Sequence, residues 1–201
     1  MMTKTVVFDL GGVLIDHDPR YLYRKLLPTE NEVTAFLTDI CHHDWNEMQD
    51  AGRSLAEATA ERISKFPDHS ELIEAYYGRW EEMLNGAIEG TVKIFEELRA
   101  LGKPTYGLSN FSAETYVTAR KRYDFLDWFE GIIVSGEDKL IKPDIRIYEL
   151  LLERYGLNSE DLIFIDDRKD NIEAAQSLGI TGIHYTSPEK LRQELNKLGR
   201  L

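Results

Sequence analysis

The stretch from Val6 to Asp16 limits the possible folds of this chain more than any other. Its apolar residues 6–8 lead into Asp9, and a glycine pair and a second apolar run follow. Residues 6–8 are β-branched or aromatic, which predicts a buried strand. An ionised carboxylate is costly away from water, so we expect Asp9 where this strand ends, held by a cation. The Gly11-Gly12 pair then allows the backbone to turn tightly and to approach a ligand.

The composition argues against several classes of protein. The 201 residues suffice for a substantial core, as one domain or one domain with an insertion. With 24 Lys and Arg against 36 Asp and Glu, the net charge is −12, which disfavours a nucleic-acid partner. The single Cys41 excludes an internal disulfide and suits a reducing cytoplasm. Asp9 interrupts the first apolar run, so the start of the chain lacks the architecture of an export signal. A membrane-spanning helix needs about 18 consecutive apolar residues, and no run in the sequence approaches that length. We therefore expect a cytoplasmic protein that binds neither nucleic acid nor membrane; its oligomeric state is not indicated.

The hydrophobic pattern divides the chain into two parts. Residues 17–89 show apolar residues at helical spacing and no convincing strand, which predicts an inserted cap of roughly four helices. From residue 91 onward helices alternate with short apolar runs, which indicates a parallel sheet covered by helices on both faces. We therefore expect an α/β core of residues 1–16 and 90–201, with the cap beside one edge of the sheet. Asp144 and Asp170 are expected to cap two of the core helices. The predicted core strands after the first are 105–108, 132–134, 162–165 and 180–185.

Polar side chains follow the apolar runs of the core. Asp9 ends the first run, Ser109-Asn110 the second and Asp166-Asp167 the fourth, while Lys142 follows the third. Parallel strands bring their carboxyl ends to one crevice, so these residues are expected to meet. Three carboxylates near one another need a cation, and Mg²⁺ prefers carboxylate, water and phosphate oxygens. Lys142 and Ser109 would then bind a phosphoryl group that Asp9 attacks.

Each of these segments has an ordinary structural interpretation when taken by itself. Ser-Asn is common in helix-capping turns, Lys-Pro-Asp can begin a helix, and Asp-Asp can lie in a solvated loop. Their joint occurrence, in this order and at four strand ends, favours the catalytic interpretation.

These segments resemble those of the haloacid dehalogenase superfamily over essentially the whole chain. The resemblance implies a Rossmann-like core, transfer of a phosphoryl group to Asp9 and hydrolysis of the product. It also implies Mg²⁺ held by Asp9, the Gly11 carbonyl, Asp167 and, directly or through water, Asp166. Ser109, Asn110 and Lys142 would bind phosphate, and the insert is similar to the α-helical cap of the subfamily with many small-metabolite phosphatases. The matching segments are Phe8-Asp9-Leu10-Gly11-Gly12-Val13, Leu108-Ser109-Asn110, Lys142-Pro143-Asp144-Ile145-Arg146-Ile147-Tyr148 and Phe164-Ile165-Asp166-Asp167-Arg168-Lys169-Asp170-Asn171.

One residue departs from the pattern. Most phosphatases of the superfamily place a general acid and base two residues after the nucleophile, where this chain has Gly11. A backbone carbonyl survives this change, but a positioned acid or base typically contributes about 10²–10⁴-fold to the rate. Candidates to replace it are Asp16, His17, Asp18, His42, His43 and Asp44.

The sequence therefore predicts a Mg²⁺-dependent phosphohydrolase of a small phosphorylated metabolite, such as a sugar phosphate or nucleotide, that forms an aspartyl-phosphate. One alternative is a metal-independent 2-haloacid dehalogenase, since these enzymes also lack the second Asp. Paired carboxylates at Asp166-Asp167 favour a metal and hence the phosphatase. A second alternative is a catalytically weak binding or regulatory protein, which only Gly11 supports.

The roles of several other residues stay open at this point. Aromatic side chains at helical spacing either shape a substrate pocket or form the core of the cap itself. Cys41 is expected to be a small buried hydrophobic residue and His184 to be structural. The cap residues concerned are Trp45, Asn46, Tyr76, Tyr77 and Trp80.

Overall fold

A computed structural model describes residues 5–201. Residues 1–4, which belong to the start where no export signal is expected, lie outside the described residues. Among residues 5–201, no helix combines the length and the hydropathy that a membrane crossing would require.

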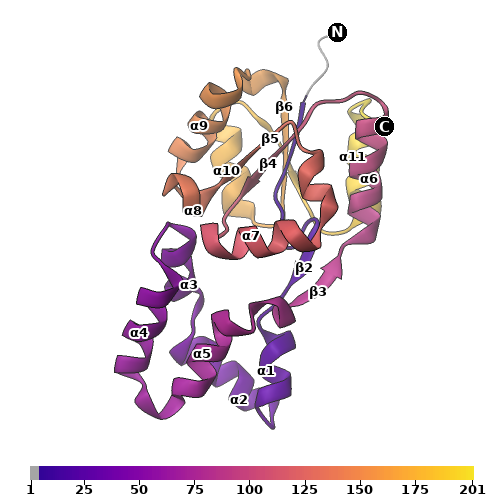
Figure 1. The fold of residues 1–201 in the computed structure, drawn as a ribbon. Coiled ribbons are helices and arrows are strands. Elements are labelled where there is room, and N and C mark those ends of the chain that lie inside the picture. Colours follow the sequence, from indigo (N-terminus) through magenta and orange to yellow (C-terminus); the bar gives the residue numbers. More distant parts are fainter. Residues whose placement is uncertain (1–4) are drawn as a thin grey trace.

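The core is a five-stranded parallel sheet with the strand order β5-β4-β1-β6-β7 (Figure 1). The expected parallel sheet is thus confirmed, with β1 at its centre. The connections run outward from β1 in both directions, first to β4 and β5 and then to β6 and β7. Such a reversal of strand order opens a crevice at the carboxyl ends of the two central strands. The strands are β1 (Thr5–Phe8), β4 (Thr105–Ser109), β5 (Gly131–Val134), β6 (Leu162–Asp166) and β7 (Thr181–His184).

Side chains of β1 alternate between two hydrophobic cores, one on each face of the sheet. Val6 and Phe8 belong to the core formed with α6 (Glu89–Ala100) and α11 (Pro188–Lys197). Val7 belongs to the other core, formed with α9 (Ile145–Tyr155) and α10 (Lys169–Ser177). Both faces of β1 are therefore buried, which explains its uninterrupted apolar sequence.

The ends of two core helices test the expected capping residues. Asp144 accepts a hydrogen bond from the backbone N–H of Arg146 and so caps α9, as predicted. The prediction for Asp170 is wrong, because α10 begins at Lys169 and Arg168 occupies the capping position. The Asp170 carboxylate instead pairs with the Arg168 guanidinium at 2.6 Å.

The insert contains five α-helices and one short ribbon. The ribbon pairs β2 (Ile15–His17) with β3 (Leu84–Ala87) in antiparallel orientation. The expectation that no strand occurs between residues 17 and 89 is therefore wrong, because strands of three and four residues are too short to show a period of two. The helices are α1 (Arg20–Leu26), α2 (Glu30–Ala35), α3 (His43–Asp50), α4 (Leu55–Lys65) and α5 (Ser70–Gly78), with a π turn at Phe36–Ile40 and 3₁₀ turns at Pro67–His69 and Trp80–Met83.

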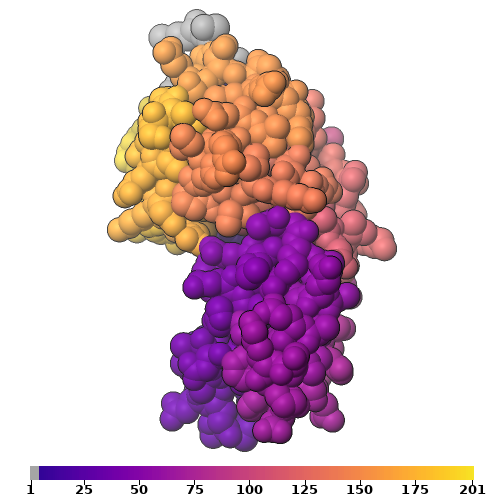
Figure 2. Space-filling model, turned by 90° about the vertical axis from the view of Figure 1, so that its left-hand side faces the viewer, coloured from indigo at the N-terminus to yellow at the C-terminus, as the bar shows by residue number. Residues whose placement is uncertain are grey.

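The helices of the insert lie beyond the carboxyl ends of the core strands (Figure 1). In the space-filling view they form the lower lobe, whose upper end lies against the core (Figure 2). Two further core helices lie near the junction of the insert with the core. They are α7 (Ala113–Arg122), which follows β4 in the sequence, and α8 (Ser135–Asp138), which follows β5. The remaining 3₁₀ turns are Asp124–Trp128 and Ser159–Asp161.

Replacement of the capping serine of α11 tests how much a single cap stabilises the core. Ser187 accepts a hydrogen bond from the backbone N–H of Lys190. We expect Ser187→Ala to lower the free energy of unfolding by about 1 kcal/mol in urea denaturation. Ser177→Ala is the matched control, because the Ser177 hydroxyl donates only to a carbonyl of its own helix, and its effect should be smaller. Equal losses in the two variants would contradict the assignment of the cap.

Candidate active site

Asp9 follows β1 and is buried at the crevice. Its Oδ1 atom accepts hydrogen bonds from the backbone N–H of Leu10 at 2.7 Å and from Lys142 Nζ at 2.9 Å. Among residues 5–201, Oδ2 has no hydrogen-bond partner, and Asp9 lines the pocket described below. Burial, together with the nearby Asp166 and Asp167, raises the pKa of Asp9 to about 7, although Lys142 opposes this shift. Asp9 thus has one carboxylate oxygen without a partner among the described residues, and the positive charge of Lys142 does not balance the negative charges around it.

Lys142 is buried and bridges two of the acidic residues. Its ammonium group lies 2.9 Å from Asp9 Oδ1 and 2.7 Å from Asp166 Oδ2, and donates to the Leu108 carbonyl at 2.8 Å. These three acceptors use all three donors of the group. Burial lowers the pKa of Lys142, but the two carboxylates that face it outweigh this effect, so the pKa is raised and the side chain stays charged.

Asn110 holds the backbone of Lys142. Its side-chain amide donates to the Lys142 carbonyl at 2.9 Å and accepts from the Lys142 backbone N–H at 2.8 Å. Both polar atoms of this side chain are therefore used inside the protein. Its predicted contact with phosphate stays a prediction, whereas its contact with Lys142 makes it a positioning residue.

Asp166 and Asp167 differ in their surroundings. Asp166 is fully buried, and Oδ1 accepts from the backbone N–H of Arg168 at 2.8 Å. Asn171 Nδ2 lies 3.0 Å from each Asp166 oxygen, so Asp166 is largely satisfied by the protein. Asp167 is exposed and lines the pocket. Asn171 was missed in the sequence, although its position one helical turn after Asp167 was a usable signal.

The three carboxylates fit a divalent cation. One oxygen from each of Asp9, Asp166 and Asp167 lies within 4.8 Å of the others. Three negative charges and one buried ammonium leave a deficit of two positive charges when all are ionised. Burial and the neighbouring acids raise the pKa values of Asp9 and Asp167, as expected for carboxylates that lack a compensating ion. A small cation with oxygen ligands, such as Mg²⁺, matches both the charge and the donor atoms.

The two glycines after Asp9 have different constraints. Gly12 has a φ of +71°, and a Cβ atom there would lie 2.6 Å from Asp167 Oδ2. A Cβ atom at Gly11 would meet no other atom within 4 Å. Gly12 is therefore required by the backbone and by the acidic cluster, whereas Gly11 has room for a side chain.

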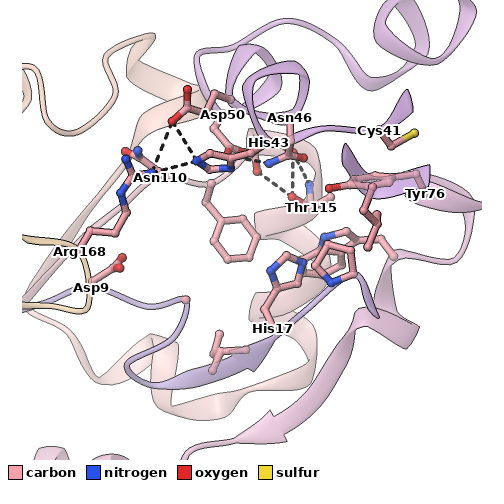
Figure 3. Close-up of a pocket in the computed structure, with 18 of the residues that line it drawn as sticks. Asp9, His17, Cys41, His43, Asn46, Asp50, Tyr76, Asn110, Thr115 and Arg168 are labelled. Carbon is pink, nitrogen blue, oxygen red and sulfur yellow. Dashed lines mark hydrogen bonds and ion pairs between the residues drawn. The ribbon is translucent and has the colours of Figure 1, made fainter. Parts of the chain in front are cut away.

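A pocket of about 430 Å³ lies between the core and the insert. Asp9 and Arg168 lie on one side of it, and Tyr76 and Cys41 on the opposite side (Figure 3). Arg168 of the core donates to His43 Nε2 of the insert at 3.0 Å, which links the two parts over the pocket. The site therefore has one end suited to a metal and an anion, and a second end formed largely by the insert.

Ser109 supplies an unused polar atom at the anionic end. Ser109 is the last residue of β4 and is buried, and its hydroxyl has no hydrogen-bond partner in the described part of the chain. A buried polar atom without a partner is costly, which is consistent with a ligand that binds there. The structure thus brings Ser109, Lys142 and the three acids to one end of the sheet.

The aromatic residues of the insert serve both structure and pocket. Tyr76 and Trp80 are buried and line the pocket, as do Asn46 and Tyr77. Trp45 is buried and packs edge-on against Tyr76 with ring centroids 5.1 Å apart, but it is not among the lining residues. These residues thus contribute both to the core of the insert and to the lining of the pocket, whereas a contact with substrate stays a prediction.

Cys41 and His184 have the environments that were expected of them. Cys41 is buried, and burial raises the pKa of its thiol to about 12, which disfavours the nucleophilic thiolate. His184 Nε2 donates to the backbone carbonyl of Asp167 at 2.9 Å, a bond within the core.

Two of the six candidate acid–base residues line the pocket, His17 and His43. Burial lowers the pKa of His17, and its buried Nε2 atom has no hydrogen-bond partner among residues 5–201. The other four candidates do not line the pocket. Asp16 accepts from Tyr21 and Asn85, Asp18 accepts from the backbone of Arg20, His42 caps α3, and Asp44 is exposed.

Comparisons with known proteins agree with this geometry. Residues 3–179 match the family model of haloacid dehalogenase-like hydrolases. A sesquiterpene phosphatase of Aspergillus oryzae is 26% identical over 195 residues, which cover 97% of this chain and 96% of that protein. A phosphorylated carbohydrates phosphatase of Thermotoga maritima is 25% identical over 90% of this chain and 84% of its own. The crystal structure of a family enzyme from Bacteroides thetaiotaomicron, in complex with magnesium and inorganic phosphate, is 26% identical, covers 92% of this chain and 95% of that chain, and superposes with a TM-score of 0.72.

Two glycine variants test the geometry of the acidic cluster. We expect Gly12→Ala to disrupt the site, because the new methyl group would collide with the Asp167 carboxylate at a positive φ. Gly11→Ala is the matched control and should fold with little loss of stability. Urea denaturation and Mg²⁺ titration followed by calorimetry measure both effects. Similar metal affinity and stability in the two variants would contradict the close approach of Gly12 to Asp167.

Proposed function

The chain belongs to the haloacid dehalogenase-like hydrolases, and from this membership we propose that it is a Mg²⁺-dependent phosphatase of small phosphorylated metabolites. Phosphatases among its relatives, and the magnesium and phosphate complex of a similar enzyme, support this class of reaction. We propose residues 17–89 as the cap that encloses the substrate, and residues 1–16 and 90–201 as the catalytic core. A cytoplasmic location is part of the same proposal.

The observation on which the proposal depends is the contact of one buried ammonium with two carboxylates. Lys142 contacts Asp9 and Asp166 where β1 and β6 end. Beside them, the unpartnered Ser109 hydroxyl offers a donor to an anion. The carboxylates on one side of the site would hold a metal, and the donors on the other side would contact the oxygens of a phosphoryl group bound to that metal.

The proposed reaction has two steps on Asp9. Asp9 Oδ2 forms a bond to phosphorus while the bond from phosphorus to the leaving-group oxygen breaks. Water then attacks the aspartyl-phosphate, which releases inorganic phosphate and regenerates the carboxylate. Lys142 orients Asp9 and stabilises negative charge on the phosphoryl oxygens through its positive charge, while the Ser109 hydroxyl is free to donate to one of them.

A divalent cation held by Asp9, Asp167, the Gly11 carbonyl and, directly or through water, Asp166 would neutralise charge on the transferred group. Because Gly11 offers no acid, protonation of the leaving oxygen falls to water or to His43, since burial lowers the pKa of His17 and keeps its imidazole neutral. Asn171 Oδ1 is buried without a partner beside Asp166 and is available to an ordered water.

The two alternative functions have less support. A metal-independent dehalogenase has no use for three carboxylates within 4.8 Å of one another. A protein without catalytic function has no need for an unpartnered oxygen on a buried carboxylate that faces a pocket. Sugar phosphates and nucleotides remain the substrate classes that we propose for a pocket of about 430 Å³.

Replacement of the proposed nucleophile gives the first test of function. We expect Asp9→Asn to abolish Mg²⁺-dependent hydrolysis of an aryl phosphate, because the amide cannot attack phosphorus, while the protein stays folded. The exposed Asp124→Asn, which also removes one negative charge, is the control and should retain full activity. Addition of EDTA to the unmodified enzyme should stop the reaction. Undiminished turnover by Asp9→Asn would refute the assignment.

Restoration of the missing acid gives a second test. The space around Gly11 admits a side chain, so Gly11→Asp should leave activity intact or raise it. An aspartate that protonates the leaving group could contribute up to about 10²–10⁴-fold. The increase should be larger for an alkyl phosphate than for an aryl phosphate, whose leaving group needs less protonation. A large loss of kcat in a folded variant would show that Gly11 itself is required.

A further inference from the structure

Asp50 lies in the pocket and takes no part in the reaction proposed above. It is the last residue of α3, and its partly exposed side chain lines the cavity between the insert and the core. The backbone N–H of Ser112, at the start of α7, donates to it. Burial raises the pKa of Asp50 to about 7, and no cation contributes to this shift. Among residues 5–201, no Lys, Arg or His forms an ion pair with this carboxylate, although charged groups shielded from water are usually paired.

A chain of hydrogen bonds fixes Asp50 as an acceptor. Arg53 Nε donates to Gln49 Oε1 at 2.8 Å, which orients the Gln49 amide. Gln49 Nε2 donates to the Tyr77 hydroxyl at 2.8 Å, and this hydroxyl in turn donates to Asn46 Oδ1 at 3.0 Å. Asn46 Nδ2 then donates to Asp50 Oδ2 at 3.0 Å. Each donor in this chain is directed toward Asp50, so the ionised carboxylate presents only lone pairs to the pocket.

The cations that line the pocket are already paired. Lys142 contacts Asp9 and Asp166, and Arg168 pairs with Asp170 and lies 3.5 Å from Glu47. Arg20, the third cation of the lining, lies 3.6 Å from Glu30 and donates to Thr34. No lining cation is left for a second anionic group on a substrate, whereas Asp50, outside the acidic cluster of Asp9, Asp166 and Asp167, is a lining carboxylate without a cation.

From this imbalance we infer that Asp50 selects phosphate esters whose leaving group carries a hydrogen-bond donor, a hydroxyl or an ammonium group, and that the pocket disfavours leaving groups with a second negative charge. The inference rests on the proposed phosphatase function and names the substrate class of the same site. The phosphoryl group would lie at Asp9, and the leaving group would extend along the wall that Asp50 and Asn46 form (Figure 3).

His17 supports the same conclusion from the opposite wall. Its ring packs against Trp80 with centroids 5.8 Å apart, and its Nε2 atom is buried without a partner. A neutral imidazole can donate a hydrogen bond to a hydroxyl group or accept one from it. A leaving group with a hydroxyl could therefore form hydrogen bonds with both Asp50 and His17.

A panel of four esters tests the selectivity of the unmodified enzyme with Mg²⁺. O-phosphoethanolamine and glycerol 3-phosphate carry donors, propyl phosphate carries none, and phosphoglycolate carries a second anion. We expect kcat/KM for at least one donor-bearing ester to exceed that for propyl phosphate by about tenfold or more, the usual effect of one hydrogen bond to a charged group. Phosphoglycolate should be the poorest substrate. A preference for ammonium over hydroxyl would identify the donor.

Asp50→Asn tests whether this carboxylate is the source of the selectivity. Its amide would turn a donor toward the ligand, so the preference for donor-bearing esters over propyl phosphate should fall about tenfold, mainly through KM. Asp44→Asn on the same helix removes an exposed charge and should keep the preference. The Asp50 carboxylate is poorly solvated, so its replacement in Asp50→Asn should leave the free energy of unfolding at pH 8 unchanged or raise it. If the carboxylate had a purely structural role, the same replacement would lower the free energy of unfolding.

The outcomes separate the two proposals. Hydrolysis of an aryl phosphate combined with equal kcat/KM for all four esters, or an unaltered preference in Asp50→Asn, would overturn the inference and leave the phosphatase assignment intact. Absence of Mg²⁺-dependent hydrolysis of any phosphate ester would overturn both.

Discussion

The contact of the Lys142 ammonium with Asp9 and Asp166 is the interaction on which the rest of the site depends. Without it, two buried carboxylates would face each other at the ends of adjacent strands, a costly arrangement. Residues from three segments keep the ammonium in place: the Leu108 carbonyl accepts from it, Asn110 fixes its backbone, and Asp166 is itself held by Asn171. The hydrogen bonds around one charge thus connect the ends of β1, β4 and β6. The acidic cluster that remains is still short of positive charge, which is what makes it suitable for a divalent cation.

The sheet and the grouping of its strand ends could be predicted because they depend on local patterns. Val6, Val7 and Phe8 are buried on both faces and therefore form an uninterrupted apolar run, which is visible in the sequence. Asp9 and Asp167 are polar residues next to such runs, and the parallel arrangement alone brings them together. The strand β1 and the parallel sheet are confirmed, and the grouping of Asp9, Ser109, Lys142 and Asp167 follows from them.

What could not be predicted depends on contacts between distant segments. Nothing in the sequence near Asn110 indicates that its amide binds the backbone of Lys142, 32 residues later. The role that we propose for Asp50 requires both the chain of donors from Arg53 and the position of α7, which no single segment contains. Asp170 was wrongly expected to cap α10, because the ion pair with Arg168 decides where its side chain lies. Local propensity fails where a tertiary partner competes for the same polar group.

The ribbon of β2 and β3 has a consequence for how such proteins diversify. The chain leaves the core at His17 and returns at Leu84, and these two residues lie opposite each other in the ribbon. The insert therefore begins and ends at neighbouring positions, so it is attached to the sheet as a closed loop. The strands that pair with β1 are β4 and β6, and no residue of the insert takes part in these pairings. Under the proposed function, recognition of the leaving group and chemistry at phosphorus would be encoded in separate stretches of the chain, so that selectivity could evolve while the reaction is conserved.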